Sequence, residues 1–306
     1  MNKIVILCTM VCLFGACTKD QPIVDEPDPG RVPTDSLLVY QSDNASSNRG
    51  IFSKSFTTGD SVLLVANSTM PYVANQRLTY IKAGKTVGYA KLNGVSKFLI
   101  DLTAPADPCL SIDARLICVV DKTADAYRLL VVDTLGNSTT LYQSTAEIKQ
   151  PEFSTDGISI YFSQKNSNGN FAVFKIASTG GTPVLLATPD TGAHYTDCAA
   201  TAYRLYFLQS REISGKLSTE ICSVNFDGGD FQKHTDHTLN WSKAGMKMEN
   251  LRKVNNSTLI FVSDYGSNNK DIYLTKTDNF SFISRITNTT ANESYPSLIP
   301  AFVKDF

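Results

Sequence analysis

The chain of 306 residues has few of the side chains on which common catalytic sites depend. It holds three histidines, no Gly-x-Ser-x-Gly motif, no His-Glu-x-x-His motif and no glycine-rich phosphate loop. The first absence excludes the nucleophile elbow of α/β-hydrolases, and the second excludes the zinc site of a large class of metalloproteases. We therefore expect a protein that is not an enzyme and that carries no cofactor and no metal.

The chain also lacks an excess of charge. Its 28 lysines and arginines nearly balance its 29 aspartates and glutamates, which leaves a formal net charge of −1. Nucleic-acid binding depends on a basic surface that displaces counterions from the phosphates, so the charge balance argues against nucleic acid as a partner. Long helical periodicity is also missing, and the apolar residues fall in short β-rich runs, which predicts an all-β protein.

What the chain has is a sixfold repeat. Each unit contains two apolar β-rich runs, with a turn residue seven positions after a marker in the second run. The first runs are centred on Leu38, Leu78, Leu116, Ile160, Leu205 and Leu259. The markers of the second runs are Phe52, Val87, Leu129, Val173, Ile221 and Ile272, and the turn residues are Gly59, Gly94, Gly136, Gly180, Gly228 and Asn279. A repeat of about 40–45 residues with several strands per unit is typical of a propeller blade.

The fourth repeat shows the unit most clearly, with four strand-like runs separated by turn residues. Asp156-Gly157 supplies the positive φ that a tight hairpin needs. The first unit, from Leu37, lacks the first of these strands, and Tyr295-Pro296-Ser297-Leu298 near the C-terminus aligns with that strand of the fourth unit, Gln150-Pro151-Glu152-Phe153. The sequence predicts a six-bladed β-propeller of four-stranded antiparallel blades, in which the C-terminal strand closes the first blade.

The run Pro-Glu-Phe-Ser-Thr-Asp-Gly from Pro151 to Gly157, followed by an aromatic strand, resembles the repeat of TolB-type, WD40-like propellers. A later Asp-Ile-Tyr strand from Asp271 to Tyr273 adds to the resemblance, which covers about residues 37–304. The resemblance implies a six-bladed, periplasmic, non-catalytic protein that binds proteins or peptides. We expect the protein to be a monomer.

The N-terminus has the pattern of a lipoprotein signal. An apolar run from Ile4 to Ala16 is too short to span a bilayer. It ends in Phe14-Gly15-Ala16-Cys17, which resembles a bacterial lipobox with Cys17 as the acylated residue. We expect a signal peptide over 1–16, a flexible proline-rich acidic tether over 17–36 and the propeller over 37–306. By resemblance to lipoproteins of the Bacteroidetes type, Cys17 would anchor the chain in the outer membrane or cell envelope, facing the periplasm or the cell surface.

Loop lengths suggest a binding surface. In a propeller the loops between the second and third strands of a blade lie on the same face as the loops that lead to the next blade. Both are longest at the fifth unit, and loops on a rigid scaffold often carry function. The candidate ligand-binding residues on these loops and beside them are Trp241, Arg211, His194, Tyr195 and Lys243. An aromatic ring among cations suits a protein, peptide or glycan partner in the cell envelope.

Two alternatives to a binding or scaffold module stay open. Some TolB-like propellers are metal-dependent lyases with several histidines, so His194, His234 and His237 could belong to a carbohydrate-active enzyme. The protein could instead be a structural component of an outer-membrane assembly.

Four cysteines follow the lipobox. Repeat alignment places Cys109 and Cys118 diagonally on one face of adjacent strands, where they could form a disulfide or remain small buried side chains. Cys198 and Cys222 have a strand between them, so we expect no bridge there.

Overall fold

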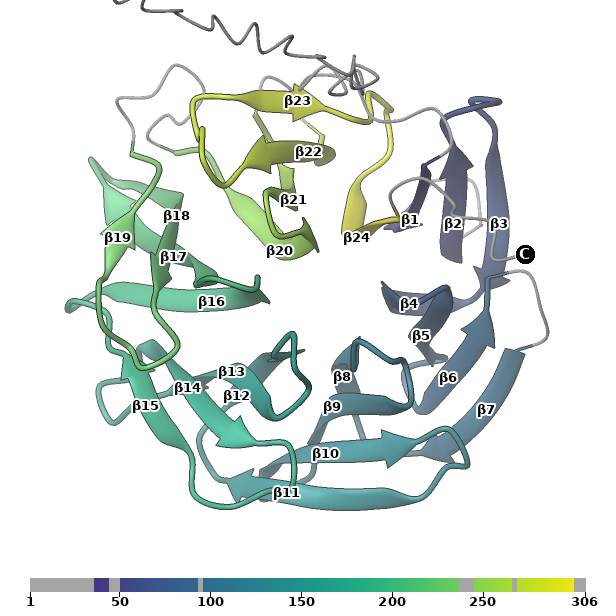
Figure 1. Cartoon of the computed structure of the whole chain (residues 1–306), viewed down its shortest axis with the longest axis horizontal. Coiled ribbons are helices and arrows are strands. Elements are labelled where there is room, and N and C mark those ends of the chain that lie inside the picture. The colour runs from purple at the N-terminus through teal and green to yellow at the C-terminus, as the bar shows by residue number, and fades with distance from the viewer. Residues whose placement is uncertain (1–35, 44–49, 93–95, 237–244, 266–268, 300–306) are drawn as a thin grey trace, which may run out of the picture.

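Six four-stranded antiparallel sheets surround a central axis and form a six-bladed propeller (Figure 1). This is a computed structural model, and it describes residues 36–43, 50–92, 96–236, 245–265 and 269–299. The predicted fold class is confirmed, including closure of the first blade by the C-terminal strand. Within the described residues, no helix is long and apolar enough to cross a membrane.

Each blade is a meander of four strands, A to D, from the axis outward. Blade one consists of β24 (Glu293–Ile299), β1 (Leu37–Ser42), β2 (Gly50–Ser55) and β3 (Ser61–Ala66). Blades two and three consist of β4 (Ser68–Ala74), β5 (Arg77–Lys82), β6 (Thr86–Lys91), β7 (Ser96–Asp101), β8 (Pro105–Leu110), β9 (Leu116–Lys122), β10 (Tyr127–Asp133) and β11 (Ser138–Ser144). Blades four and five consist of β12 (Ile148–Phe153), β13 (Ser159–Lys165), β14 (Phe171–Ala177), β15 (Val184–Ala187), β16 (Ala193–Ala200), β17 (Leu205–Ile213), β18 (Lys216–Val224) and β19 (Gln232–Lys233). Blade six consists of β20 (Met248–Asn255), β21 (Thr258–Ser263), β22 (Asp271–Lys276) and β23 (Ile283–Arg285).

The centres of the first runs match this register in every blade but the third. The markers of the second runs match it in every blade but the first, where Ile51 and not the predicted Phe52 occupies the position of Val173. The markers of the first and second runs all lie in B and C strands. In blade four Phe153 pairs with Ile160, and the equivalent pair in blade three is Leu110 with Ile117. The centre of the first run in blade three is therefore Ile117, and the alignment on Leu116 was wrong by one residue. The adjoining apolar run, Leu-Ile-Cys-Val-Val, offers no internal mark of register.

The glycine of the C–D turn marks the place where one blade rests on the previous one. Gly228 has φ +88°, and a Cβ built there would lie 2.4 Å from the carbonyl oxygen of Leu186 in β15. At Gly136 the corresponding distance to the carbonyl oxygen of Leu99 in β7 is 2.7 Å. At these two positions only a residue without a Cβ permits both the positive φ and the close approach.

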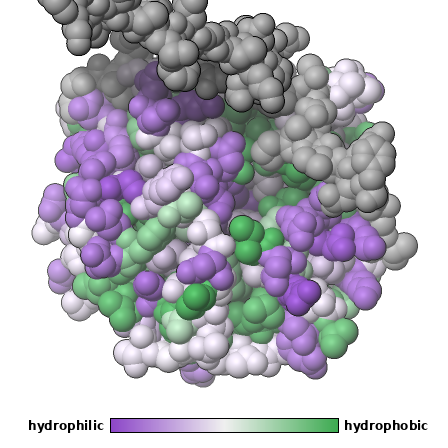
Figure 2. Space-filling view, in the orientation of Figure 1, coloured by the Kyte–Doolittle hydropathy of each residue, from purple (hydrophilic) through white to green (hydrophobic). Residues whose placement is uncertain are grey.

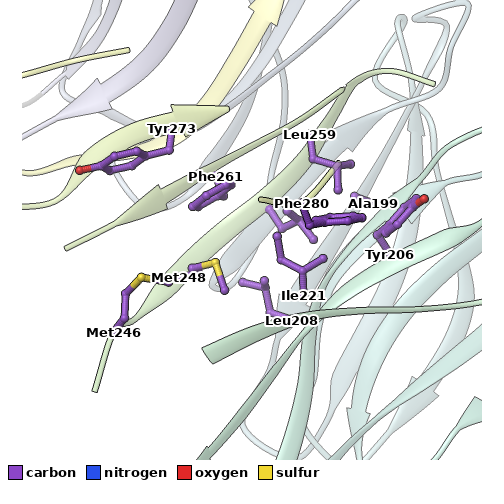
Figure 3. Close-up of a cluster of buried hydrophobic side chains, with 11 residues drawn as sticks. Ala199, Tyr206, Leu208, Ile221, Met246, Met248, Leu259, Phe261, Tyr273 and Phe280 are labelled. Carbon is purple, nitrogen blue, oxygen red and sulfur yellow. The ribbon is translucent and has the colours of Figure 1, made fainter. Parts of the chain in front are cut away.

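Apolar side chains pack between neighbouring sheets. One such cluster joins blades five and six and includes Leu208, Ile221, Leu259, Phe261 and Tyr273, all nearly free of solvent contact (Figure 3). B and C strands are apolar on both faces because each sheet is covered on both sides. The radial stack of sheets is held by burial at about 25 cal/mol per Å² of apolar surface.

A ring of hydrogen bonds surrounds the axis. Every A strand has a β-bulge containing a non-glycine residue with positive φ: Met70, Asp107, Gln150, Asp197, Asn250 and Tyr295, which we call the girdle residues. From Asp107 onward, each girdle N–H donates to the side chain of the girdle residue in the preceding blade, over 2.8–3.3 Å. The N–H of Met70 donates instead to Oε1 of Gln41 in β1, over 2.9 Å.

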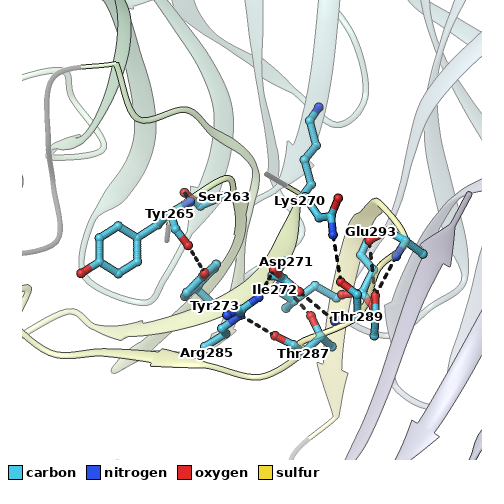
Figure 4. Close-up of polar contacts among 12 residues, drawn as sticks. Ser263, Tyr265, Lys270, Asp271, Ile272, Tyr273, Arg285, Thr287, Thr289 and Glu293 are labelled. Carbon is cyan, nitrogen blue, oxygen red and sulfur yellow. Dashed lines mark hydrogen bonds and ion pairs between the residues drawn. The ribbon is translucent and has the colours of Figure 1, made fainter. Parts of the chain in front are cut away.

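Closure of the ring combines a strand pairing with polar contacts. β24 pairs antiparallel with β1, and the N–H of Glu293 donates to the carbonyl oxygen of Lys270, which precedes β22 in blade six. Thr289 links Glu293 with the buried Asp271, which is ion-paired with Arg285 (Figure 4). The C-terminal strand is thus tied to blade six as well as to the blade that it completes.

Deletion of residues 294–306 should destabilise the whole ring. It removes the β24 pairing with β1 and the buried side chain of Leu298, whose loss alone should cost about 2–3 kcal/mol. We expect a lower melting temperature in thermal unfolding monitored by circular dichroism. An unchanged melting temperature would show that β24 contributes nothing to closure.

Gln150→Ala should test the girdle. The substitution leaves the N–H of Asp197 without its acceptor and removes the amide that donates to Oδ1 of Asp197, at an expected cost of about 1–3 kcal/mol. Gln143→Ala on the exposed surface of β11 is the matched control and should change the free energy of unfolding by less than about 0.5 kcal/mol. Equal stability of the two variants in urea titrations would contradict the role of the girdle.

Candidate functional site

Three side chains from alternate blades meet across the axis beside the girdle. Tyr72 of blade two donates its hydroxyl to both carboxylate oxygens of Glu152 in blade four, over 3.0 and 2.9 Å. The guanidinium of Arg252 in blade six lies 4.7 Å from the Tyr72 ring centroid and donates to the carbonyl oxygen of Pro71 and, over 3.0 Å, to Oγ of Ser297. We call Tyr72, Glu152 and Arg252 the axial layer. All occupy blade positions two residues after a girdle residue.

The carboxyl groups on the axis are held in a low-dielectric environment. Burial raises the pKa of Glu152 to about 7, although the nearby charges of Lys253 and Arg252 and the Tyr72 hydrogen bond act in the opposite direction. Burial also raises the pKa of Asp197 in the girdle to about 7, and Asp107 adds to that rise. Each group therefore changes its charge near neutral pH rather than near pH 4.

A depression opens from the axial layer toward the A–B turns. Its volume is about 230 Å³, and a smaller cavity of about 30 Å³, roughly the volume of one water molecule, lies among the girdle residues. The polar lining of the depression consists of the axial layer with Lys253, Asn75, Ser154, Thr155 and Ser297. Apolar lining comes from Val73, Ala74, Leu110, Ile112, Phe153, Val254, Leu298 and Ile299.

The A–B turns of three consecutive blades carry exposed apolar side chains. They are Ile112, Ile158 and Tyr203, of blades three, four and five, with exposed fractions of 56%, 66% and 74%. We call these three residues the apolar rim. Ile112 also lines the depression, so the rim meets the depression at blade three. On the face of the propeller drawn in Figure 2, apolar side chains form separate groups between polar ones.

The arrangement is suited to binding. The cations of Arg252 and Lys253 and the carboxyl group of Glu152 lie beside hydroxyl, amide and apolar side chains in one concave site. Such a set of groups can hold a partner by charge, hydrogen bonding and burial of apolar surface. In the described part of the chain, no group of three or more His, Cys, Asp or Glu side chains is arranged to hold a metal ion.

The structure separates the residues predicted to bind a ligand near the fifth blade. Tyr195 is buried and packs its ring 4.7 Å from that of Phe207, so it belongs to the core. Arg211 lies within β17 and forms an ion pair of 3.3 Å with Glu220. The predicted B–C loop is not a loop, because β17 and β18 extend into a hairpin that ends in the two-residue turn Ser214-Gly215. Trp241 and Lys243 lie outside the described residues.

The two described histidines are not brought together. Nδ1 of His194, in β16, accepts the backbone N–H of Phe171 over 3.2 Å. His234 follows β19, stacks on Phe280 with ring centroids 4.4 Å apart and shares a 2.7 Å hydrogen bond with Ser223. Burial lowers the pKa of His234 to about 4. Two strands separate β16 from β19 in the sheet, and His237 lies outside the described residues.

The four cysteines within the described residues are free and buried. Cys109 and Cys118 are direct register partners on β8 and β9, so their predicted diagonal relation was wrong, for the one-residue reason given above. Cys198 follows a girdle residue directly and lines the small cavity. Cys222 lies on β18, with β17 between the two, as predicted.

Sequence reasoning missed the axial layer and the depression, although a signal for them exists. In four of six A strands the girdle residue precedes proline, at Pro71, Pro108, Pro151 and Pro296. The residue after each proline occupies the position that the axial-layer residues have in their own blades. The alignment of Gln150-Pro151 with Tyr295-Pro296 marks this position in two blades, whereas loop length predicted a binding surface on the opposite face.

Comparisons with known proteins give the fold. No protein-family model and no curated protein matches this chain by sequence. Among solved structures, TolB from Acinetobacter baumannii is similar with a TM-score of 0.70 and 12% identity, over 88% of this chain and 68% of that one. A chain of a nidogen/laminin complex has a TM-score of 0.62 and 11% identity, over 87% and 99%.

An oligogalacturonate lyase in complex with manganese is also similar, with a TM-score of 0.57 and 12% identity, over 84% of this chain and 80% of that one. At such identities the likeness concerns the backbone and not the residues of a site. The chain therefore has the six-bladed propeller fold of TolB-like proteins.

Proposed function

We propose that this protein is a non-catalytic binding module that holds a polypeptide partner on the face of its A–B turns. The observation that carries the proposal is that exposed apolar side chains on three consecutive A–B turns accompany the central depression, which one of them, Ile112, lines. Exposed apolar side chains near a concave site are a mark of an interaction surface. The rigid ring beneath them fixes their relative positions, which lowers the entropy lost on binding.

The rim favours a polypeptide over a glycan. Ile112 and Ile158 offer aliphatic surface, which suits apolar side chains better than the hydroxyl groups of a sugar. Tyr203 adds an exposed ring, and tyrosine is enriched where proteins meet. The similar propeller in a nidogen/laminin complex supports the use of this architecture in a protein complex.

The N-terminal pattern supports an envelope location. We propose that residues 1–16 are a signal peptide, that acylated Cys17 anchors the chain to the membrane, and that residues 17–36 form a tether for the propeller. A tethered propeller could reach partners near its membrane, in the periplasm or at the cell surface.

The two alternatives have less support. A lyase that used the histidines jointly would need His194 and His234 at one site, and they lie on separated strands. A structural role in an outer-membrane assembly would use the same surface for a permanent partner, so it differs from our proposal in the lifetime of the complex and not in the residues.

The double variant Ile158→Ser, Tyr203→Ser should lose its partner without loss of stability. Both side chains are more than half exposed, so their removal should change the free energy of unfolding by less than about 0.5 kcal/mol each. If the rim is the contact, affinity should fall about tenfold or more. The measurement is quantitative mass spectrometry of envelope proteins that copurify with the wild-type chain and with the variant after cross-linking.

Leu63→Ser, on the outer strand of blade one, is the matched control and should keep the partner. Trp241→Ala tests the predicted surface near the fifth blade in the same experiment. Loss of the partner in Trp241→Ala and its retention in the rim variant would place binding on the opposite face and overturn the proposal.

Cys17→Ala should release the protein from the membrane. Without the thiol no acyl chain can be attached, and burial of acyl chains contributes about 0.8 kcal/mol per CH₂ group to anchoring. Fractionation should show the variant in the soluble envelope fraction, and mass spectrometry should show an unmodified N-terminal peptide. Unchanged partition and peptide mass would contradict the lipid anchor.

A further inference from the structure

We infer that the central depression binds a carboxylate of the partner polypeptide and that this binding takes up a proton at Glu152. The inference rests on the proposed function, and it adds the chemical group that is recognised and the link to pH. A polypeptide can supply the carboxylate from its C-terminus or from an aspartate or glutamate side chain.

The cations of the depression have capacity to bind an anion. Arg252 is held in place by Tyr72 on one blade and by Tyr295, whose ring centroid is 5.7 Å from the guanidinium, on another. Its Nη1 donates to Pro71 and Ser297, and no acidic side chain in the described residues forms an ion pair with it. Lys253 follows it in the chain, lines the same depression and likewise has no ion pair among the described residues.

Glu152 is the nearby group of opposite charge, and it too has no ion pair in the described part of the chain. Its carboxylate accepts the Tyr72 hydroxyl and is only 3% exposed. When Glu152 is ionised, it partly neutralises the two cations and repels an incoming carboxylate. When Glu152 is protonated, the lining carries two positive charges and gains an O–H donor.

Two other carboxyl groups share the small cavity with Glu152: Asp107, whose pKa burial raises, and Asp197, whose pKa burial raises to about 7. Both belong to the girdle and lie outside the lining of the depression. Tyr72 on β4 and the thiols of Cys109 on β8 and Cys198 on β16 have pKa values raised by burial, so they remain protonated. Arg252 and Lys253 on β20 carry the positive charges that lower the pKa of Glu152.

The sign of the pH effect follows from the pKa of Glu152, which burial raises to about 7. Below pH 7 the carboxyl is neutral and ready to accept an anion, and above pH 7 it is charged. The carboxylate of a polypeptide stays ionised down to about pH 4–5. Apparent affinity scales with the fraction of protein in the competent form, so it should fall about tenfold between pH 6 and pH 8.

The test uses four small probes titrated into the isotopically labelled full chain and followed by amide chemical shifts. N-acetyl-leucine represents a chain end, and N-acetylglutamic acid amide represents an acidic side chain. The matched neutral probes are N-acetyl-leucinamide and N-acetylglutamine amide. At pH 6 we expect one of the two acids to bind about tenfold more tightly than its amide, which also identifies the source of the carboxylate.

Three variants separate the role of Glu152 from that of Lys253. Glu152→Gln keeps an acceptor for Tyr72 and cannot ionise, so at pH 8 it should bind the acid as the wild-type chain does at pH 6 and show no pH dependence. Lys253→Met should weaken binding of the acid about tenfold and leave the neutral probes unaffected. Lys91→Met, an exposed lysine of blade two outside the depression, is the control and should change nothing.

Equal binding of both acids and their amides at pH 6 would overturn the inference. Binding of an acid with the same pH dependence in Glu152→Gln and the wild-type chain would also overturn it. Either result would leave the proposed function standing if the rim variant still lost its partner, so the two failures can be told apart.

Discussion

Six backbone N–H groups on the axis must find acceptors, and the structure depends on how they do so. Each belongs to a bulged, positive-φ residue in an A strand, a conformation that costs about 1–3 kcal/mol for a non-glycine residue. The side chain of the preceding blade's girdle residue satisfies five of these groups. The sixth group is the N–H of Met70, which would need an acceptor on Tyr295. The Tyr295 side chain has no acceptor near its backbone, and the N–H of Met70 donates to Gln41 instead. The girdle joins neighbouring blades where no strand pairing can, because the sheets are separate.

The girdle also determines where variation can occur. Two positions after each girdle residue, the blades present Tyr72, Cys109, Glu152, Ala199, Arg252 and Ser297. Four of these side chains, those of Tyr72, Glu152, Arg252 and Ser297, line the depression, whereas Cys109 and Ala199 belong to buried apolar clusters. None of them has to meet the backbone requirement imposed on the girdle. A symmetric scaffold thereby produces an asymmetric site, in which Tyr72, Glu152 and Arg252 connect alternate blades.

The low sequence identity to structures of similar fold has the same origin, because the scaffold and the site place different requirements on the sequence. Closure, the glycine of the C–D turn and apolar strands covered on both faces are requirements of size and conformation, which many sequences meet. TolB from A. baumannii has a similar fold at 12% identity. The chemistry of the depression depends on a handful of positions, so it has to be argued from this chain's own residues.

The sequence by itself determined the sixfold repeat, the strand content and the closure by Tyr295–Leu298, because these arise from local periodicity and turn chemistry that repeat six times. It did not determine the register of blade three, where the run from Leu116 to Val120 is apolar at every position. Loop length wrongly indicated an open B–C loop at blade five, because added residues can extend a hairpin. The meeting of Tyr72, Glu152 and Arg252 was decided only by the tertiary structure, since these residues are up to 180 positions apart in the chain and become neighbours only when the ring closes.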